Sequence, residues 1–147
     1  GRSQGEGCYC FVNGLLKTQV GRLSENYNYV IMDNEAGMEH ISRGTMGRMD
    51  ILLLVSDCSR RGIQAVARIR DLRIPVIKLI VNRAPNGELN EGTAEEIEKQ
   101  GLDLLGVIPM DQQVFEYDAY GKPLVTLPED SAARKAVREI IDKLEIK

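Results

Sequence analysis

Short apolar runs alternate along this chain with stretches whose apolar residues recur every three or four positions. The short runs have the length of β-strands and cover 29–32, 50–55, 76–81 and 104–108. The periodic stretches are typical of amphipathic helices and cover 9–23, 59–72, 92–100, 114–120 and 132–144. This alternation predicts an α/β fold, with a parallel sheet covered by helices on both faces.

Helix-capping residues support several of these boundaries. Ser59 is expected to cap the helix that follows it, and Asp130 or Ser131 to cap the last helix. Thr93 and Glu96 have the spacing of a capping box at the start of the 92–100 helix.

Composition narrows the class of protein. Net charge is −3, which does not favour nucleic-acid binding through a basic field. No apolar run approaches the ~20 residues of a membrane span, so stable membrane insertion is not expected. The three cysteines do not resemble a disulfide framework, and we expect a cytoplasmic protein.

The size and the first residues bear on domain organisation. The 147 residues are enough for a single domain with its own core. The chain opens on the loop-like stretch 1–7 without an initiator Met, so we expect 1–147 to be the C-terminal portion of a longer domain.

In parallel α/β sheets, ligands bind beyond the carboxyl ends of the strands. The run 29–32 is followed there by Asp33, Glu35 and Gly37. Asp33 is a candidate Mg²⁺ ligand, and the glycine offers an open N–H to a γ-phosphate, which would make this loop a nucleotide-dependent switch. The alternative is that Asp33 and Asn34 only cap the following turn.

Two further strand ends carry candidate base contacts. Asn82 and Arg83 follow Val81, and an asparagine amide can read a purine edge. Guanine-specific hydrolases place a carboxylate just beyond this point, and none follows here, which favours adenine. The sequence Pro109-Met110-Asp111 follows Ile108, and its backbone can face the base. A turn-forming Asn and a strand-ending Pro are the simpler alternatives.

Cys8 and Cys10 form the sharpest local motif. They lie at an expected helix start, where the thiol pKa is lowered, and two thiolates one residue apart can bind one soft metal ion. A closed tetrahedral site needs four ligands, so a two-fold homodimer is the economical way to complete it. The alternative is a pair of inert, partly buried thiols. Cys58 is expected to be a packed thiol, and His40 to be structural.

A phosphate-gripping motif is missing from these residues. No GxxxxGK[ST] sequence occurs in the chain. The expected switch and base pocket therefore stand without a phosphate-binding loop of their own.

The motifs together resemble a known family. Cys8-Tyr9-Cys10, the run 33–40, Val81-Asn82-Arg83, the run 107–111 and the run 120–124 occur in one order across essentially the whole chain. This order is similar to that of the carbon monoxide dehydrogenase maturation ATPases of the CooC type. That family belongs to the MinD/ParA and nitrogenase-iron-protein class of deviant P-loop ATPases.

The resemblance implies a function and its residues. It implies a homodimeric ATPase that assists nickel insertion into carbon monoxide dehydrogenase, with ATP or ADP and Mg²⁺ at the nucleotide site. Cys8 and Cys10 correspond to the family's Zn²⁺- or Ni²⁺-binding pair, Asp33 and Gly37 to its switch, and Asn82 to its adenine contact. The family's P-loop, catalytic lysines and first switch have no counterpart here, so ATP hydrolysis is expected of the full-length protein rather than of these residues alone.

Two alternatives stay open. One is a MinD/ParA-type positioning or partitioning ATPase, which usually carries a basic tail or patch. The helix 132–144 is mixed in charge and fits that reading less well. The other is a metal-bridged dimerisation module without catalytic activity.

Overall fold

The computed structural model describes residues 9–33, 49–69 and 74–144. The chain divides into two compact units, 1–50 and 51–147. Cys8, Glu35, Gly37 and His40 lie outside the described residues.

The first unit contains helix α1, Tyr9–Ser24, which confirms the helix predicted there. An extended segment, 27–33, follows the turn at 25–26. The prediction of a strand at 29–32 is wrong, because the structure assigns no β-strand to this segment. Ile31 is 93% exposed. An apolar run becomes a strand only where a neighbouring strand satisfies its N–H and C=O groups.

The second unit is built on a parallel sheet of three strands in the order β1-β2-β3. The strands are β1 (Ile51–Asp57), β2 (Val76–Ala84) and β3 (Leu104–Pro109). The expected parallel α/β arrangement is confirmed, with three of the four predicted strands paired in the described part of the chain.

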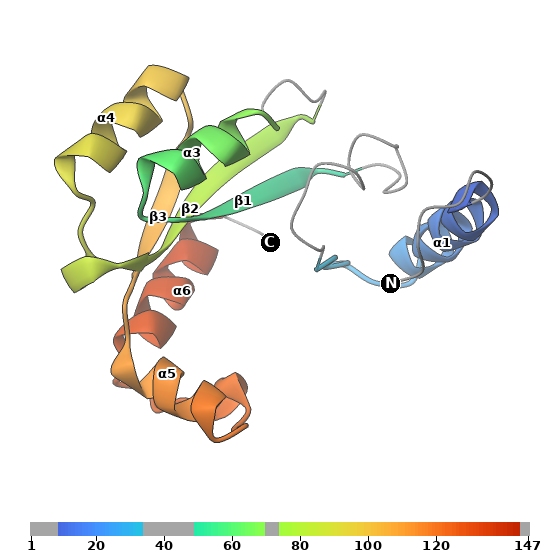
Figure 1. The fold of residues 1–147 in the computed structure, drawn as a ribbon. Coiled ribbons are helices and arrows are strands. Elements are labelled where there is room, and N and C mark those ends of the chain that lie inside the picture. The colour runs from blue at the N-terminus through green and yellow to red at the C-terminus, as the bar shows by residue number, and fades with distance from the viewer. Residues whose placement is uncertain (1–8, 34–48, 70–73, 145–147) are drawn as a thin grey trace. The chain divides into compact units, whose positions relative to one another are not determined.

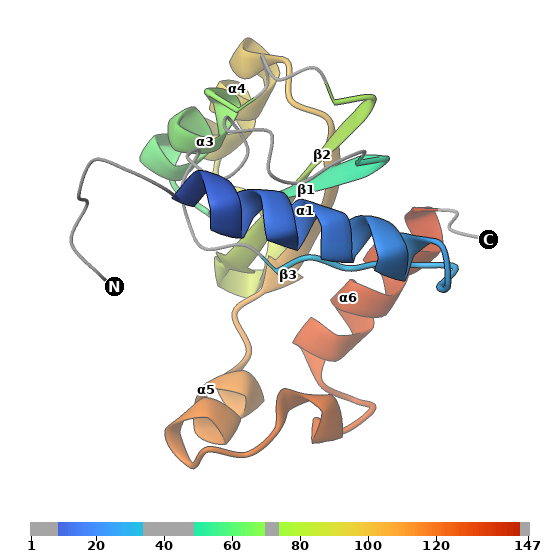
Figure 2. The same ribbon diagram turned by 90° about the vertical axis from the view of Figure 1, so that its right-hand side faces the viewer.

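Four α-helices and two short 3₁₀ helices complete the described part of the second unit. They are α3 (Arg60–Ala67), α4 (Glu91–Gln100), α5 (Gln112–Ala119), α6 (Ala132–Lys143), η1 (Pro85–Gly87) and η2 (Leu124–Thr126). Figure 1 and Figure 2 show α3 and α4 on one face of the sheet and α6 on the other. Helix α3 ends earlier than predicted, at Ala67.

The face under α3 and α4 is the better sealed of the two. Alternate residues of β1 and β2 point to it, α3 packs against β1 and α4, and Ile63 of α3 and Ile97 of α4 are buried. The buried apolar residues of this layer are Leu52, Leu54, Ile63, Ala67, Leu79, Val81 and Ile97. Gly62 is required where α3 crosses β1, because any Cβ there would collide with the side chains of Ser56 and Asp57.

The α6 face has a smaller core. Ile80, Leu105 and Ile140 form it, with Ile108 and Leu144 packed at its edge. Gly106 allows α6 to approach β3 closely, since a Cβ at this position would overlap the side chain of Ile140.

Capping agrees with the sequence at two helices and differs at a third. Ser59 accepts a hydrogen bond from the Gly62 N–H at 3.0 Å, and Ser131 caps α6. The capping box predicted at Thr93 and Glu96 is wrong, because Asn90 caps α4 and accepts from the Thr93 N–H at 2.9 Å. Both Thr93 and Glu96 are instead fully buried.

Candidate functional site

The carboxyl ends of the three strands converge on one edge of the sheet. Asp57 at the end of β1 is the register partner of Asn82 in β2. Ala84 of β2 is paired with Pro109 of β3, and the Met110 N–H donates to the Ala84 carbonyl at 2.9 Å. This edge therefore brings together the predicted base contacts of two different loops.

Asn82 and Arg83 lie within the last residues of β2 and not in the loop after it. The strand runs to Ala84, whereas the sequence predicted that it ends at Val81. The pairing of β2 with β3 is irregular between Val81 and Ala84. Within this irregularity Arg83 has a φ of 56°. A left-handed backbone at a residue that is not glycine is strained, and such strain concentrates at binding sites.

The local conformation fixes the Asn82 side chain. Its Oδ1 accepts from the Arg83 N–H at 2.9 Å, so the left-handed turn and the amide are coupled. The Nδ2 group is then the donor that remains for a ligand. Arg83 is exposed, and Asn82 is half-buried.

Pro109 and Met110 form the opposite side of this edge. The turn η1 comes close to β3, where a Cβ on Gly87 would lie 3.5 Å from the Pro109 Cβ. Met110 is 65% exposed, which gives an apolar surface next to the polar Asn82–Arg83 turn. A planar base fits such a combination of an apolar face and an amide edge.

Asp111 serves the fold at this edge. One of its carboxylate oxygens accepts from the Gln113 N–H at 2.8 Å, which caps α5. The other accepts from the Ala133 N–H at 3.0 Å and from the Ser131 hydroxyl at 2.7 Å, at the start of α6. The Ala133 N–H is the largest cause that lowers the pKa of Asp111; burial opposes it, and the Ser131 hydroxyl lowers the pKa further. This carboxylate holds two helix starts together.

Asp57 is a site residue that the sequence reasoning did not single out. It is exposed at the end of β1, and the Ser59 hydroxyl donates to its Oδ1 at 2.6 Å. Its position after an apolar strand was the available signal, the same one that drew attention to Asp33.

A buried polar cluster lies behind the edge, between α3 and α4. Glu96 accepts from Gln100 at 2.8 Å and pairs with Arg60 at 3.2 Å. The Gln100 amide is the main cause that lowers the pKa of Glu96. Thr93 donates to the Cys58 carbonyl at 3.3 Å, which ties the start of α4 to the end of β1. The Cys58 thiol, part-buried beside Asn90, is packed as expected.

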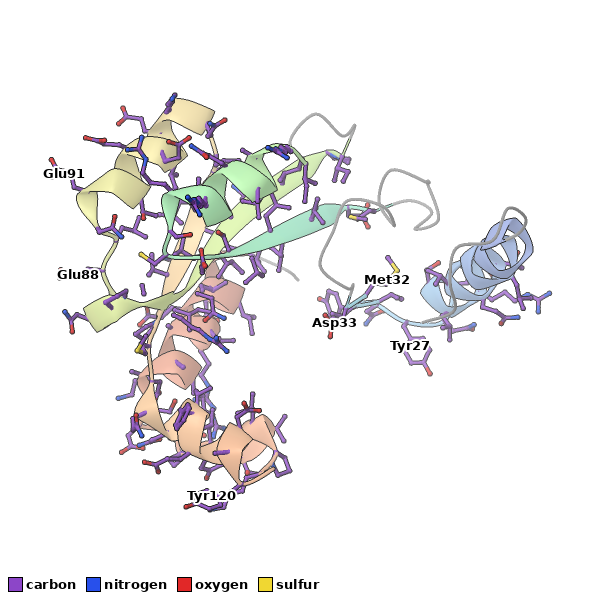
Figure 3. All side chains as sticks on the ribbon, in the orientation of Figure 1. Tyr27, Met32, Asp33, Glu88, Glu91 and Tyr120 are labelled. Carbon is purple, nitrogen blue, oxygen red and sulfur yellow. The ribbon has the colours of Figure 1, made fainter. Side chains whose placement is uncertain are left out.

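The residues predicted to form a switch and a metal site belong to the first unit. Asp33 ends the extended segment, where Figure 3 labels it beside Met32, and its side chain is exposed. Glu35, Gly37 and Cys8 lie outside the described residues. Cys10 lies in α1, but its side chain is outside the description. Among the residues that are described, no three His, Cys, Asp or Glu side chains come together as a metal site.

The fold of the second unit and the order of its elements match those of a known ATPase class. The structure of the septum site-determining protein MinD of Pyrococcus horikoshii, solved with Mg-ADP, superposes with a TM-score of 0.72 at 18% identity. The match covers 90% of this chain and 56% of that one. It establishes a MinD-like α/β fold.

Two relatives found by sequence comparison share more identical residues with this chain than the MinD structure does. An uncharacterized ATP-binding protein of Methanocaldococcus jannaschii is 36% identical over 98% of this chain and 59% of its own length. The carbon monoxide dehydrogenase accessory protein CooC of Rhodospirillum rubrum is 34% identical over 80% of this chain and 46% of its own length. The relatives of this chain are thus ATP-binding proteins of the MinD/ParA type. The chain spans about half the length of these relatives.

No protein-family model matches the chain. Within the described residues, no helix is long and apolar enough to cross a membrane.

Proposed function

We propose that this chain is part of a MinD/ParA-type ATPase that assists nickel insertion into carbon monoxide dehydrogenase. The ATP-binding relatives support the nucleotide half of this proposal, and the similarity to CooC supports the maturation half. The whole protein would bind ATP with Mg²⁺ and act as a homodimer.

The nucleotide-binding part of the proposal rests on one edge of the sheet. There the end of β2, with Asn82 and Arg83, lies beside Pro109 and Met110. Its left-handed turn holds the Asn82 amide in place before any ligand arrives, which reduces the ordering cost of binding. The amide then reads the purine edge, while Pro109 and Met110 contact the ring. Asp111 holds the start of α5 next to this surface and does not contact the base itself.

The phosphate end of the nucleotide needs groups beyond those found in the second unit. Asp33 and Glu35 are the proposed carboxylates for Mg²⁺ and its water, and the N–H of Gly37 the proposed sensor of the γ-phosphate. The 147 residues contain no GxxxxGK[ST] sequence, so ATP hydrolysis belongs to the whole protein.

The metal half rests on the thiols of Cys8 and Cys10. Two thiolates from each protomer give the four soft ligands of a tetrahedral Zn²⁺ or Ni²⁺ site. If ATP binding favours the closed dimer, it strengthens metal binding, and bound metal strengthens ATP binding by the same factor.

Nucleotide binding to the full-length protein tests the first half. Asn82→Ala should weaken ATP binding about 5- to 150-fold, the value of one good amide–base pair, and should reduce discrimination against GTP. Isothermal titration with ATP and GTP measures both effects. Gln19→Ala removes an exposed amide from α1 and should leave both affinities unchanged. Equal ATP affinity in Asn82→Ala and in the unmodified protein contradicts the base contact.

Metal content tests the second half. The double variant Cys8→Ala/Cys10→Ala should lose bound Zn²⁺ or Ni²⁺ and should dissociate more readily into monomers. Cys58→Ala is the matched control and should keep both properties, because this thiol is packed beside Asn90. Elemental analysis and light scattering report the two quantities. Unchanged metal content and dimer mass in the double variant would exclude the shared thiol site.

A MinD-type positioning ATPase is the second candidate, favoured by the fold. A complementation assay for carbon monoxide dehydrogenase maturation distinguishes the two candidate functions. The protein should restore nickel-dependent activity to cells that lack their own accessory ATPase, and a positioning ATPase should not.

A further inference from the structure

Met110 is the only residue between the end of β3 and the N-cap of α5, and the chain is fixed on both sides of it. Its own N–H donates to the Ala84 carbonyl at 2.9 Å, which ties it to the end of β2. The next residue, Asp111, caps α5 by accepting from the Gln113 N–H. The position of Met110 therefore depends on how the carboxylate of Asp111 is anchored.

The second anchor of this carboxylate lies 20 residues further along the chain. The Ser131 hydroxyl donates to Asp111 Oδ2 at 2.7 Å, and the Ala133 N–H donates to the same oxygen at 3.0 Å. Ser131 is only 1% exposed, and its hydroxyl also accepts from the Arg134 N–H at 3.2 Å as the N-cap of α6. One buried hydroxyl thus caps α6 and holds the carboxylate beside Met110.

The segment between Asp111 and Ser131 has little packing of its own to fix its position. No residue of α5 or of η2 is buried. Figure 1 and Figure 2 show α5 beyond the end of β3, away from α3 and α4. Because most of the stability of a short helix comes from packing, the hydrogen bonds at Asp111 decide where α5 begins.

The Ser131 hydroxyl matters for this anchor because Asp111 serves two helices at once. Hydrogen bonds to an ionised carboxylate are stronger than those between neutral groups. Without the hydroxyl, Asp111 Oδ2 keeps one donor instead of two, and the Arg134 N–H loses its cap. The carboxylate is then held less tightly, and the backbone at Met110 is released with it.

We propose that Ser131 is a positioning residue of the nucleotide site, which acts on the base through Asp111 and Met110. The proposal rests on the base-binding role given above to Asn82, Pro109 and Met110. Ser131 does not contact the ligand. It keeps the base-facing surface in place before the ligand arrives, which reduces the ordering cost of binding. Because such coupling is reciprocal, a bound base also tightens the start of α6.

Nucleotide titration of the full-length protein tests the proposal. Ser131→Ala should weaken ATP binding about fivefold or more, the lower end of typical coupling between sites. It should leave the binding of inorganic tripolyphosphate unchanged, because this probe has no base. Ser131→Thr keeps the capping hydroxyl and should restore ATP binding. Ile140→Val removes one methyl group from the core under α6, controls for lost stability, and should bind ATP as the unmodified protein does.

Amide hydrogen exchange without nucleotide gives a second measurement on the same proteins. The Met110 N–H, which is paired with the Ala84 carbonyl, should exchange at least about tenfold faster in Ser131→Ala than in the unmodified protein. In Ile140→Val its rate should not change. ATP should slow exchange of the Ala133 N–H more in the unmodified protein than in Ser131→Ala.

The outcomes separate this inference from the proposed function. If Asn82→Ala weakens ATP binding and Ser131→Ala does not, the base contact stands and the role of Ser131 is overturned. Equal losses of ATP and tripolyphosphate binding in Ser131→Ala would also overturn it, because the defect would not concern the base.

Two further results have a defined meaning. If the unmodified protein binds no ATP, the proposed function is wrong, and exchange at Met110 alone decides whether Ser131 holds this edge. If Ser131→Ala does not fold, Asp111→Asn decides, because it keeps one acceptor oxygen for α5 and removes the other from α6.

Discussion

The two faces of the sheet in the second unit are made by the same strands but differ in how they are covered. On the α3–α4 face, Leu52 and Leu54 of β1 are 8% and 4% exposed. On the α6 face, Leu53 and Val55 of the same strand are 39% and 57% exposed. The strand supplies apolar residues to both faces equally, so the helices, and not the strand, determine burial.

The sealed face also buries polar groups between its two helices. Thr93 and Glu96 are fully buried there, and each has hydrogen-bond partners on a neighbouring element. Burial of a carboxylate is costly unless it is paired, so Arg60 and Gln100 are needed to keep Glu96 in place. Paired polar groups thus join α3, α4 and the end of β1 on this face, behind the candidate nucleotide edge.

The largest effect is expected at the centre of the sealed face. Ile63→Ala removes a side chain with no exposure and should destabilise the chain by about 2–5 kcal/mol through a cavity under α3. Urea denaturation followed by circular dichroism measures the change. A loss below about 1 kcal/mol would mean that the two faces differ less than their burial indicates.

The second-largest loss of stability is expected from a substitution in the covered part of the α6 face. Gly106→Ala places a methyl group against Ile140 and should cost about 1–3 kcal/mol through overpacking. Gly14→Ala, in a position with nothing near the added methyl group, is the control and should not destabilise. Thermal melts of both variants make the measurement. Equal stability of the two variants would show that α6 shifts freely on β3.

The junction between the nucleotide edge and α6 should be sensitive to pH. Asp111→Ala removes one carboxylate that serves two helix starts and should cost about 1–3 kcal/mol at neutral pH. Asp130→Ala, an exposed carboxylate nearby, should have little effect.

The sign of the pH effect follows from the lowered pKa of Asp111. The folded state favours the ionised carboxylate, so its stabilisation is complete above the ordinary pKa of 3.8 and is lost as the pH falls below it. Urea titrations between pH 7 and strongly acidic pH should show this loss in the unmodified chain. The same dependence in Asp111→Ala would assign it to other carboxylates.

The smallest effect is expected on the open face. Val55→Thr exchanges one β-branched side chain for another at an exposed position, and stability of the isolated chain should change by no more than about 0.5 kcal/mol. Val81→Thr makes the same exchange at a fully buried position of β2 and should cost clearly more. Similar losses at both positions would show that Val55 is covered in solution.

The elements of the second unit could be predicted from the sequence because the patterns that indicate them span only a few neighbouring residues. The alternation of apolar runs and periodic stretches located β1, β2, β3 and the helices between them, and Ser59 and Ser131 cap as their positions suggested. The strand ends also pointed to Asn82 and Pro109 as candidate base contacts, and the structure pairs Ala84, two residues after Asn82, with Pro109 at the carboxyl edge of the sheet.

Other features depended on contacts between distant residues. The apolar run 29–32 has the local properties of a strand, yet within the described residues the structure assigns no strand there, because pairing depends on residues distant in sequence. Thr93 matches a capping box by spacing, yet its hydroxyl is drawn to the Cys58 carbonyl, 35 residues away, and Asn90 takes the cap.

The amino-acid sequence by itself determined which residues can form strands and helices, where helices begin, and which side chains reach the carboxyl edge. The tertiary structure alone decided that β2 extends through a left-handed Arg83, that Asp111 joins α5 to α6, and that one face of β1 is sealed while the other is open. The reason is physical: propensity and periodicity act over a few residues, whereas burial and hydrogen-bond pairing require partners that only the assembled fold supplies.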